Sequence, residues 1–162
     1  MTRKLTLFIS WSQQPSQAIA EAIKLWIAIC LPDVKVFLST EILAGQRWGR
    51  TLADNLEQID YGILIYTSNN LDSLWMAFEA GALSKNHAES RVVPLLFDVS
   101  PSDLSSPISQ FQSKSFNPDD LRQLLIDLNN LQAESVRRPE AELVDLAKET
   151  WSLVEAKINT AI

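Results

Sequence analysis

Apolar stretches typical of buried strands alternate along the chain with stretches in which apolar residues recur every three or four positions. The strand-like stretches are Leu5–Ile9, Val34–Leu38, Tyr61–Tyr66, Val92–Phe97 and a weaker one within Gln110–Phe116. The stretches with helical period lie at 19–30, 48–59, 72–85, 121–131 and 144–158. This alternation predicts an α/β protein with a flavodoxin-like, doubly wound sheet of about five parallel strands and helices on both faces.

Prolines bear on three of these predicted elements. Pro15 lies near the start of the first predicted helix. The run Asn117-Pro118-Asp119-Asp120 combines a cap residue, a proline and two acids, which predicts a helix beginning there. Pro94 falls inside the fourth predicted strand, although proline cannot donate to a strand ladder and belongs at edges or bulges.

Length and composition predict a single domain over residues 1–162, with a core at about 5–130 and a C-terminal helix at about 139–160. Apolar residues make up 46% of the chain, and its longest apolar run, Leu25–Leu31, is too short to span a bilayer. Because Cys30 is the single cysteine, no intrachain disulfide forms. The protein is therefore expected to be cytoplasmic.

The net charge of -6, with no run of Lys or Arg longer than two, disfavours nucleic acid or an anionic membrane as a partner. The single histidine, His87, and the single cysteine give little support to a metal site or a Cys–His nucleophile pair, so no metal is expected.

Glu79 is the one charged residue in an otherwise apolar helical stretch, Leu74–Leu83. An unpaired buried carboxylate is costly, so Glu79 has a partner, faces a cleft or carries a raised pKa. Trp75 lies one turn earlier on the same helix face and would wall such a cleft. The alternative is that Glu79 is satisfied by an arginine or by backbone N–H groups at the edge of the core.

Two connections after strands carry further candidates. Ser10 and Trp11 follow the first strand, where Trp11 is either a stacking platform or a lid over the first helix. The loop Ser39–Arg47 contains Ile42 and Leu43, which predicts a contact surface or a lid unless both residues fold back onto the core.

Taken together, these segments resemble TIR domains, specifically the bacterial kind associated with anti-phage defence. The resemblance rests on Phe8-Ile9-Ser10, on Glu41-Ile42 with Gly45 and Trp48, and on Trp75-x-x-x-Glu79 followed by Ala80-Gly81-Ala82-Leu83. It covers roughly residues 5–130.

The resemblance implies an NAD glycohydrolase or ADP-ribosyl cyclase, with NAD as substrate and no further cofactor. It places the catalytic glutamate on Glu79, the nicotinamide-side wall on Ser10 and Trp11, and the loop aromatic on Trp48. The family's loop aspartate falls on Glu41 or Ser39, which departs from the common pattern. Family members usually self-associate to complete the site, which implies that the Ser39–Arg47 loop reaches a second copy.

The chemistry suits a lone carboxylate. Most glycosidases need a second carboxyl group to protonate the leaving oxygen. Nicotinamide in NAD is already a cation and leaves neutral, so one anion beside an oxocarbenium-like ribose suffices. Two alternatives remain: a non-enzymatic TIR adaptor that works by assembly, and an enzyme like the nucleoside deoxyribosyltransferases. A response-regulator receiver is nearly excluded, because Ser10 and Thr67 stand where its acids would be.

Overall fold

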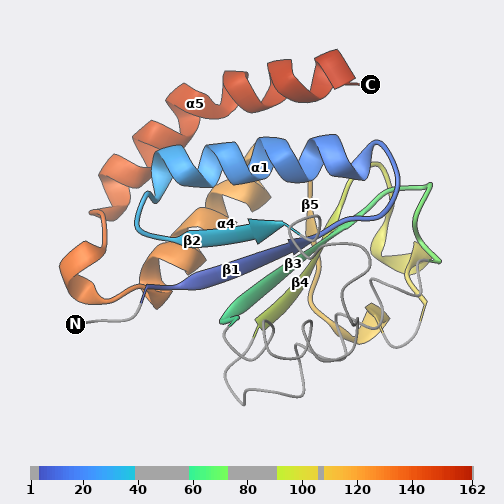
Figure 1. Cartoon of the computed structure of the whole chain (residues 1–162), viewed down its shortest axis with the longest axis horizontal. Coiled ribbons are helices and arrows are strands. Elements are labelled where there is room, and N and C mark those ends of the chain that lie inside the picture. Colours follow the sequence, from blue (N-terminus) through green and yellow to red (C-terminus); the bar gives the residue numbers. More distant parts are fainter. Residues whose placement is uncertain (1–3, 39–58, 73–90, 106–107, 162) are drawn as a thin grey trace, which may run out of the picture.

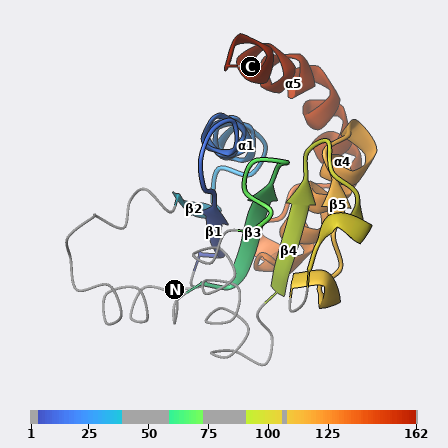
Figure 2. The same ribbon diagram turned by 90° about the vertical axis from the view of Figure 1, so that its right-hand side faces the viewer.

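The computed structural model describes residues 4–38, 59–72, 91–105 and 108–161 of the chain, and the structural statements below concern these residues. Five parallel strands form one sheet in the order β2-β1-β3-β4-β5, and Figure 2 shows them side by side in this order. The strands are β1 (Thr6–Ser10), β2 (Lys35–Leu38), β3 (Tyr61–Tyr66), β4 (Arg91–Leu96) and β5 (Lys114–Ser115). The predicted five-stranded parallel sheet is confirmed.

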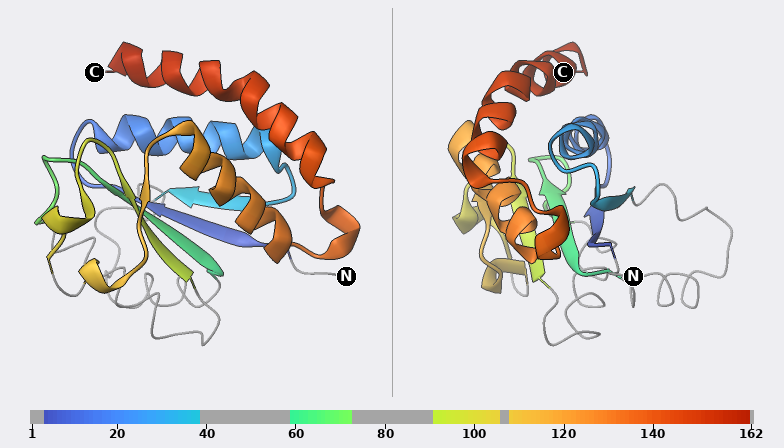
Figure 3. Two further views of the ribbon diagram at one scale, coloured as in Figure 1. Left: turned by 180° about the vertical axis from the view of Figure 1, so that it is seen from behind. Right: turned by 90° about the vertical axis from the view of Figure 1, so that its left-hand side faces the viewer.

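Three long helices lie on one side of this sheet, where two of them pack on the strands and the C-terminal one packs on these two (Figure 1). They are α1 (Ser16–Cys30), α4 (Pro118–Leu131) and α5 (Glu140–Ala161). α5 packs against both α1 and α4, an arrangement that Figure 3 shows from behind. Three short 3-10 turns complete the described chain: η2 (Pro101–Asp103), η3 (Ile108–Gln110) and η4 (Glu134–Val136). The helices predicted at 48–59 and 72–85 lie outside the described residues, except for residues 59 and 72.

Strand alternation divides the core between the two faces of the sheet. Leu7 and Ile9 of β1 are fully buried beneath the three helices, whereas Phe8 packs in a second cluster on the opposite face. The second cluster continues through β3 and β4 to Leu104 and Ile108. Because both faces of the central strands are buried, the sequence of these strands is continuously apolar rather than alternating.

One buried polar contact joins the C-terminal helix to the core. Trp26 Nε1 of α1 donates a hydrogen bond of 2.8 Å to the hydroxyl oxygen of Thr150 in α5. That hydroxyl donates in turn to the Leu146 carbonyl oxygen at 2.7 Å. The rings of Trp26 and Trp151 meet edge to face, with centroids 5.4 Å apart. A buried indole N–H without an acceptor would cost about 1–3 kcal/mol, so Thr150 stabilises the burial of Trp26 at this helix contact.

Pro94 is accommodated because its nitrogen faces the open part of a strand edge. Phe97 N donates to Tyr66 O on β3, and Phe116 N donates to Leu96 O from the β5 side. Backbone groups of successive residues face opposite neighbours, so the nitrogen of Pro94 faces the β5 side, as the Leu96 carbonyl does. β5 pairs only with Leu95 and Leu96, which leaves no ladder bond for Pro94 to donate. The predicted fourth strand is therefore compatible with its proline.

The polar run at residues 117–120 begins the helix α4, as predicted from the sequence. Asn117 is the cap residue, and its side-chain oxygen accepts a hydrogen bond of 2.8 Å from Asp120 N. Pro118 occupies the first helical position, where its missing N–H costs nothing. Asp120 also accepts from Ser115 N at 2.8 Å, which ties the helix start to the short strand β5.

Candidate active site at the switch point of the sheet

The order of the strands reverses between β1 and β3. From β1 the chain continues to β2 at one edge of the sheet, whereas from β3 it continues to β4 and β5 toward the other edge. In doubly wound sheets, ligands bind in the crevice beyond the carboxyl ends of the strands at such a reversal. Here the adjoining segments are residues 11–15, called the β1 turn below, and residues 67–72, called the β3 turn. The fold therefore places the candidate site between these two turns.

Ser10 and Trp11 lie at this edge, as the sequence predicted, but in different surroundings. Ser10 is fully buried opposite Leu64 of β3, and strand alternation directs its side chain to the face that contains Phe8. Trp11 is half-buried and packs against the core that includes α1, with its indole nitrogen buried. Both interpretations of Trp11, a stacking platform and a lid over the first helix, stay predictions. That Ser10 and Trp11 contact a substrate stays a prediction.

The β1 turn is held by the hydroxyl of Ser16, the first residue of α1. Ser16 is fully buried, and its oxygen accepts a hydrogen bond of 3.0 Å from Ser12 N. The same hydroxyl lies 2.8 Å from Ser12 O and 2.6 Å from Gln13 O, which are acceptors for its single proton. Gln13 has a φ of 64°, in the left-handed region that costs a residue with a Cβ about 1–2 kcal/mol. Ser16 thus stabilises a turn that contains no glycine.

The β3 turn is held by the side chain of Asn70, which is 3% exposed. Its oxygen accepts from Thr67 N at 2.8 Å, and its nitrogen donates to Ile65 O at 2.9 Å. The Thr67 hydroxyl accepts in addition from Asn69 N at 3.3 Å. The buried amide of Asn70 thus binds one backbone N–H and one backbone carbonyl oxygen, which fixes the path of the chain as it leaves β3.

A hydrogen bond also connects the two turns to each other. Asn69 Nδ2 in the β3 turn donates to Gln14 O in the β1 turn at 3.0 Å. Ser16, Asn69 and Asn70 are not among the site residues that the sequence predicted. Their residue types are the ones that form local side-chain to backbone bonds in turns, which was the available signal.

Several predicted site residues lie outside the described residues. These are Glu79, Trp48, Trp75, Glu41, Ser39 and the apolar pair Ile42 and Leu43. Their predicted roles stay predictions. The described part of the site consists of the end of β1, the β1 turn and the β3 turn.

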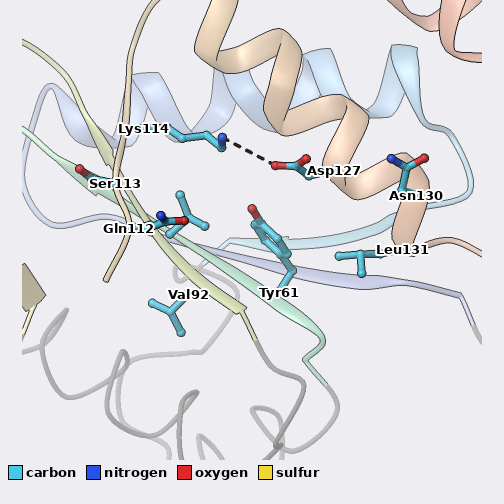
Figure 4. A pocket seen from close by; sticks show the side chains of 9 residues that line it. Tyr61, Val92, Gln112, Ser113, Lys114, Asp127, Asn130 and Leu131 are labelled. Atoms are coloured by element: carbon cyan, nitrogen blue, oxygen red, sulfur yellow. Dashed lines mark ion pairs between the residues drawn. The ribbon is translucent and has the colours of Figure 1, made fainter. Parts of the chain in front are cut away.

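A cavity of about 650 Å³ lies at the opposite, amino end of the strands (Figure 4). Tyr61 and Val92, at the starts of β3 and β4, line it together with Lys114 of β5 and Asp127 of α4. Lys114 Nζ lies 3.6 Å from Asp127 Oδ2, and both side chains are partly exposed. Such a pair contributes at most about 1 kcal/mol. The cavity lies at the end of the sheet where this fold class does not place its ligands.

The described residues contain neither a cluster of metal ligands nor a reactive thiol. Within them no group of three or more His, Cys, Asp or Glu could hold a metal ion. Burial raises the pKa of the Cys30 thiol, an effect reduced by its hydrogen bond with Thr150 and by the charge of Arg138. Cys30 is therefore a protonated core residue rather than a nucleophile. None of the described helices is both long and apolar enough to cross a membrane.

Comparison with known proteins supplies the family. The family model of the TIR domain matches residues 7–126. The TIR domains in the structure of the activated Roq1 resistosome, which directly recognises the pathogen effector XopQ, superpose with a TM-score of 0.51 at 14% identity. That match covers 91% of this chain and 99% of the other.

Two oxidoreductases give structural matches with lower TM-scores. An azoreductase from Bacillus anthracis str. Sterne has a TM-score of 0.44 at 10% identity, covering 91% of this chain and 100% of the other. The oxidoreductase FerB from Paracoccus denitrificans has a TM-score of 0.40 at 10% identity, covering 98% and 97%. No curated protein matches the sequence. Since the TIR model covers most of the chain and the sheet has the corresponding topology, this protein belongs to the TIR domain family.

Proposed function

We propose that this TIR domain cleaves NAD at its nicotinamide–ribose bond, with Glu79 as the catalytic carboxylate. The observation that carries the proposal is the family match over residues 7–126, which includes the Trp75-x-x-x-Glu79 segment. The topology supports it, because the switch point between β1 and β3 is where a nucleotide binds in this fold class.

The mechanism follows from the charge of the leaving group. Nicotinamide leaves as a neutral molecule, so the reaction needs no general acid, and positive charge develops on the ribose. The Glu79 carboxylate stabilises that charge, and this stabilisation strengthens as the bond breaks. Water or a group of the ADP-ribose itself then attacks the anomeric carbon, which yields ADP-ribose or a cyclic isomer. The Ser10 and Trp11 end of β1 forms the nicotinamide side of the site, with Trp48 and Trp75 as further walls.

We further propose that the active form is a self-associated one, in which the Ser39–Arg47 loop contacts a second copy, and that the protein acts in the cytoplasm in bacterial anti-phage signalling. The assembled state of the Roq1 resistosome, the structure that contains the similar TIR domains, is compatible with self-association here. Neither a metal nor a further cofactor takes part in the proposed reaction.

The test is an incubation of purified protein with NAD, followed by chromatography of nicotinamide and of linear and cyclic products. Nucleosides are incubated in parallel. Nicotinamide release that falls on the order of 100-fold in Glu79→Gln, and is retained in the matched control Glu149→Gln on the exposed side of α5, supports the proposal. Absence of nicotinamide release at every protein concentration would leave the adaptor as the function. Exchange of bases between nucleosides without NAD cleavage would favour the deoxyribosyltransferase-like alternative.

A further inference from the structure

A side-chain hydrogen bond joins the two turns at the switch point. Asn69 is exposed, and its Nδ2 donates to the backbone oxygen of Gln14 at 3.0 Å across a sequence separation of 55 residues. Gln14 offers only a backbone acceptor to this bond. The interaction therefore depends on the chemistry of one side chain, the amide of Asn69.

Each turn is braced internally, so the bond joins two units of fixed shape. The Ser16 hydroxyl contacts Ser12 and Gln13 within the β1 turn at 2.6–3.0 Å. The Asn70 amide holds Thr67 N and Ile65 O at the start of the β3 turn. Because this bracing lies inside each turn and β1 pairs directly with β3, removal of the Asn69 contact leaves both turns and the sheet in place. It removes a bond that joins the turns beyond the ends of the two strands.

The two turns are also the ones that lead to the proposed reacting groups. The β1 turn begins with Trp11, and the chain that leaves the β3 turn reaches Glu79 ten residues after Asn69. We propose that Asn69 is a positioning residue, whose bond to Gln14 fixes the spacing of the two turns that flank the NAD crevice. This inference rests on the proposed function, because it assigns the spacing to the binding of NAD.

A spacing role has a kinetic signature that differs from that of a catalytic residue. Without the bond, only a fraction of molecules have the turns at the spacing that binds NAD, and the apparent affinity falls by that fraction. Saturating NAD selects the competent spacing again and restores the rate. Loss of the bond therefore raises KM and preserves kcat, whereas loss of the Glu79 charge lowers kcat.

The experiment compares the full chain with Asn69→Asp, Asn69→Gln and Asn130→Asp. Asn69→Asp replaces the donor with an acceptor that faces the Gln14 carbonyl oxygen. Asn130→Asp makes the same change of charge at an exposed residue of α4 near the amino end of the sheet. Asn69→Gln keeps an amide donor on a longer side chain. We expect Asn69→Asp to raise the KM for NAD about tenfold with kcat within about twofold, Asn69→Gln to recover most of the affinity, and Asn130→Asp to match the unmodified chain.

Hydrogen exchange of residues 11–16 provides a readout that does not need catalysis. Faster exchange there in Asn69→Asp than in Asn130→Asp, without a lower melting temperature, supports the spacing role. If the unmodified chain cleaves NAD, an unchanged KM in Asn69→Asp overturns the spacing role, whether kcat is lower or not. If the unmodified chain does not cleave NAD, the proposed function fails by itself. Equal exchange in the two Asp variants then overturns the spacing of the turns as well.

Discussion

The two ends of the sheet differ in what holds them together. At the amino end, the strands and α4 line an open cavity of about 650 Å³, whose lining includes the partly exposed pair Lys114 and Asp127. At the carboxyl end, the side chains of Ser16, Asn69 and Asn70 form hydrogen bonds with backbone groups of the β1 turn and the β3 turn. A partly exposed ion pair lies at the cavity, whereas several side-chain to backbone hydrogen bonds fix the shape of the turns.

The difference also concerns the polarity of the helix ends at the two edges of the sheet. Each strand of a parallel sheet leads to the next helix from its carboxyl end, so α1 and α4 begin there. Their first N–H groups and positive dipole ends lie at the same edge, where they favour a negatively charged ligand. Helices end at the amino edge, which gives the cavity there the opposite polarity. NAD carries a pyrophosphate, so we expect it to bind at the carboxyl end.

The strongest test of this assignment is Glu79→Gln, for which we expect the largest effect. The change keeps size and hydrogen bonding but removes the charge that stabilises a cationic ribose. The turnover of NAD should fall on the order of 100-fold, while NAD binding is less affected. Thermal melting should be unchanged or raised, because an isolated buried carboxylate costs folding energy.

If Glu79 were instead a member of a core ion pair, its replacement should cost about 3–5 kcal/mol of stability. Turnover and melting are therefore measured on the same sample. A Glu79→Gln protein that melts early and still cleaves NAD normally would contradict the catalytic role.

Replacement of both Ile42 and Leu43 by Asp tests whether the carboxyl end is completed by a second copy. Charges buried unpaired at such a contact are costly, and each 1.4 kcal/mol weakens association tenfold. We expect turnover at a fixed protein concentration to fall by about tenfold or more with the fold retained. Sedimentation and a dilution series of specific activity provide the measurement. Specific activity that is independent of concentration, together with a harmless double change, would show that one copy suffices.

Trp11→Ala should change the ratio of cyclic to linear product more than it changes the rate of nicotinamide release. In the proposed site, an aromatic ring at the end of β1 stacks on adenine after nicotinamide leaves and so favours cyclisation over attack by water. An aromatic contact contributes about 0.5–1.5 kcal/mol, which corresponds to a change of about two- to tenfold in the ratio of cyclic to linear product. Product chromatography measures this ratio beside nicotinamide release. Equal loss of both products would mean that Trp11 acts only as a lid over α1.

Asp127→Asn, at the amino end, should have the smallest effect. It removes a partly exposed ion pair, so unfolding by urea should show a change of at most about 1 kcal/mol. NAD cleavage should be unchanged, because the cavity lies at the end of the sheet away from the switch point. A loss of NAD cleavage in a normally folded Asp127→Asn protein would reverse the assignment of the two ends.

The sequence alone determined the strands, the α4 start and the class of fold. Continuous apolar runs such as Tyr61–Tyr66 were recognisable because both faces of that strand are buried. The cap at Asn117 was recognisable because it depends on neighbours three residues away. The two-residue strand β5 was only weakly indicated, since so short an element depends on its pairing with β4.

The tertiary structure decided what the local pattern does not contain. Pro94 is tolerated because β5 begins opposite Leu95, beyond the proline. The indole N–H of Trp26 has an acceptor because Thr150, 124 residues away, packs against it. The contact of Asn69 with Gln14 exists because β1 and β3 are neighbours in the sheet, although they are distant in sequence. Propensity and hydrophobic period act over a few residues, whereas these contacts arise from the order of the strands, which only the folded sheet fixes.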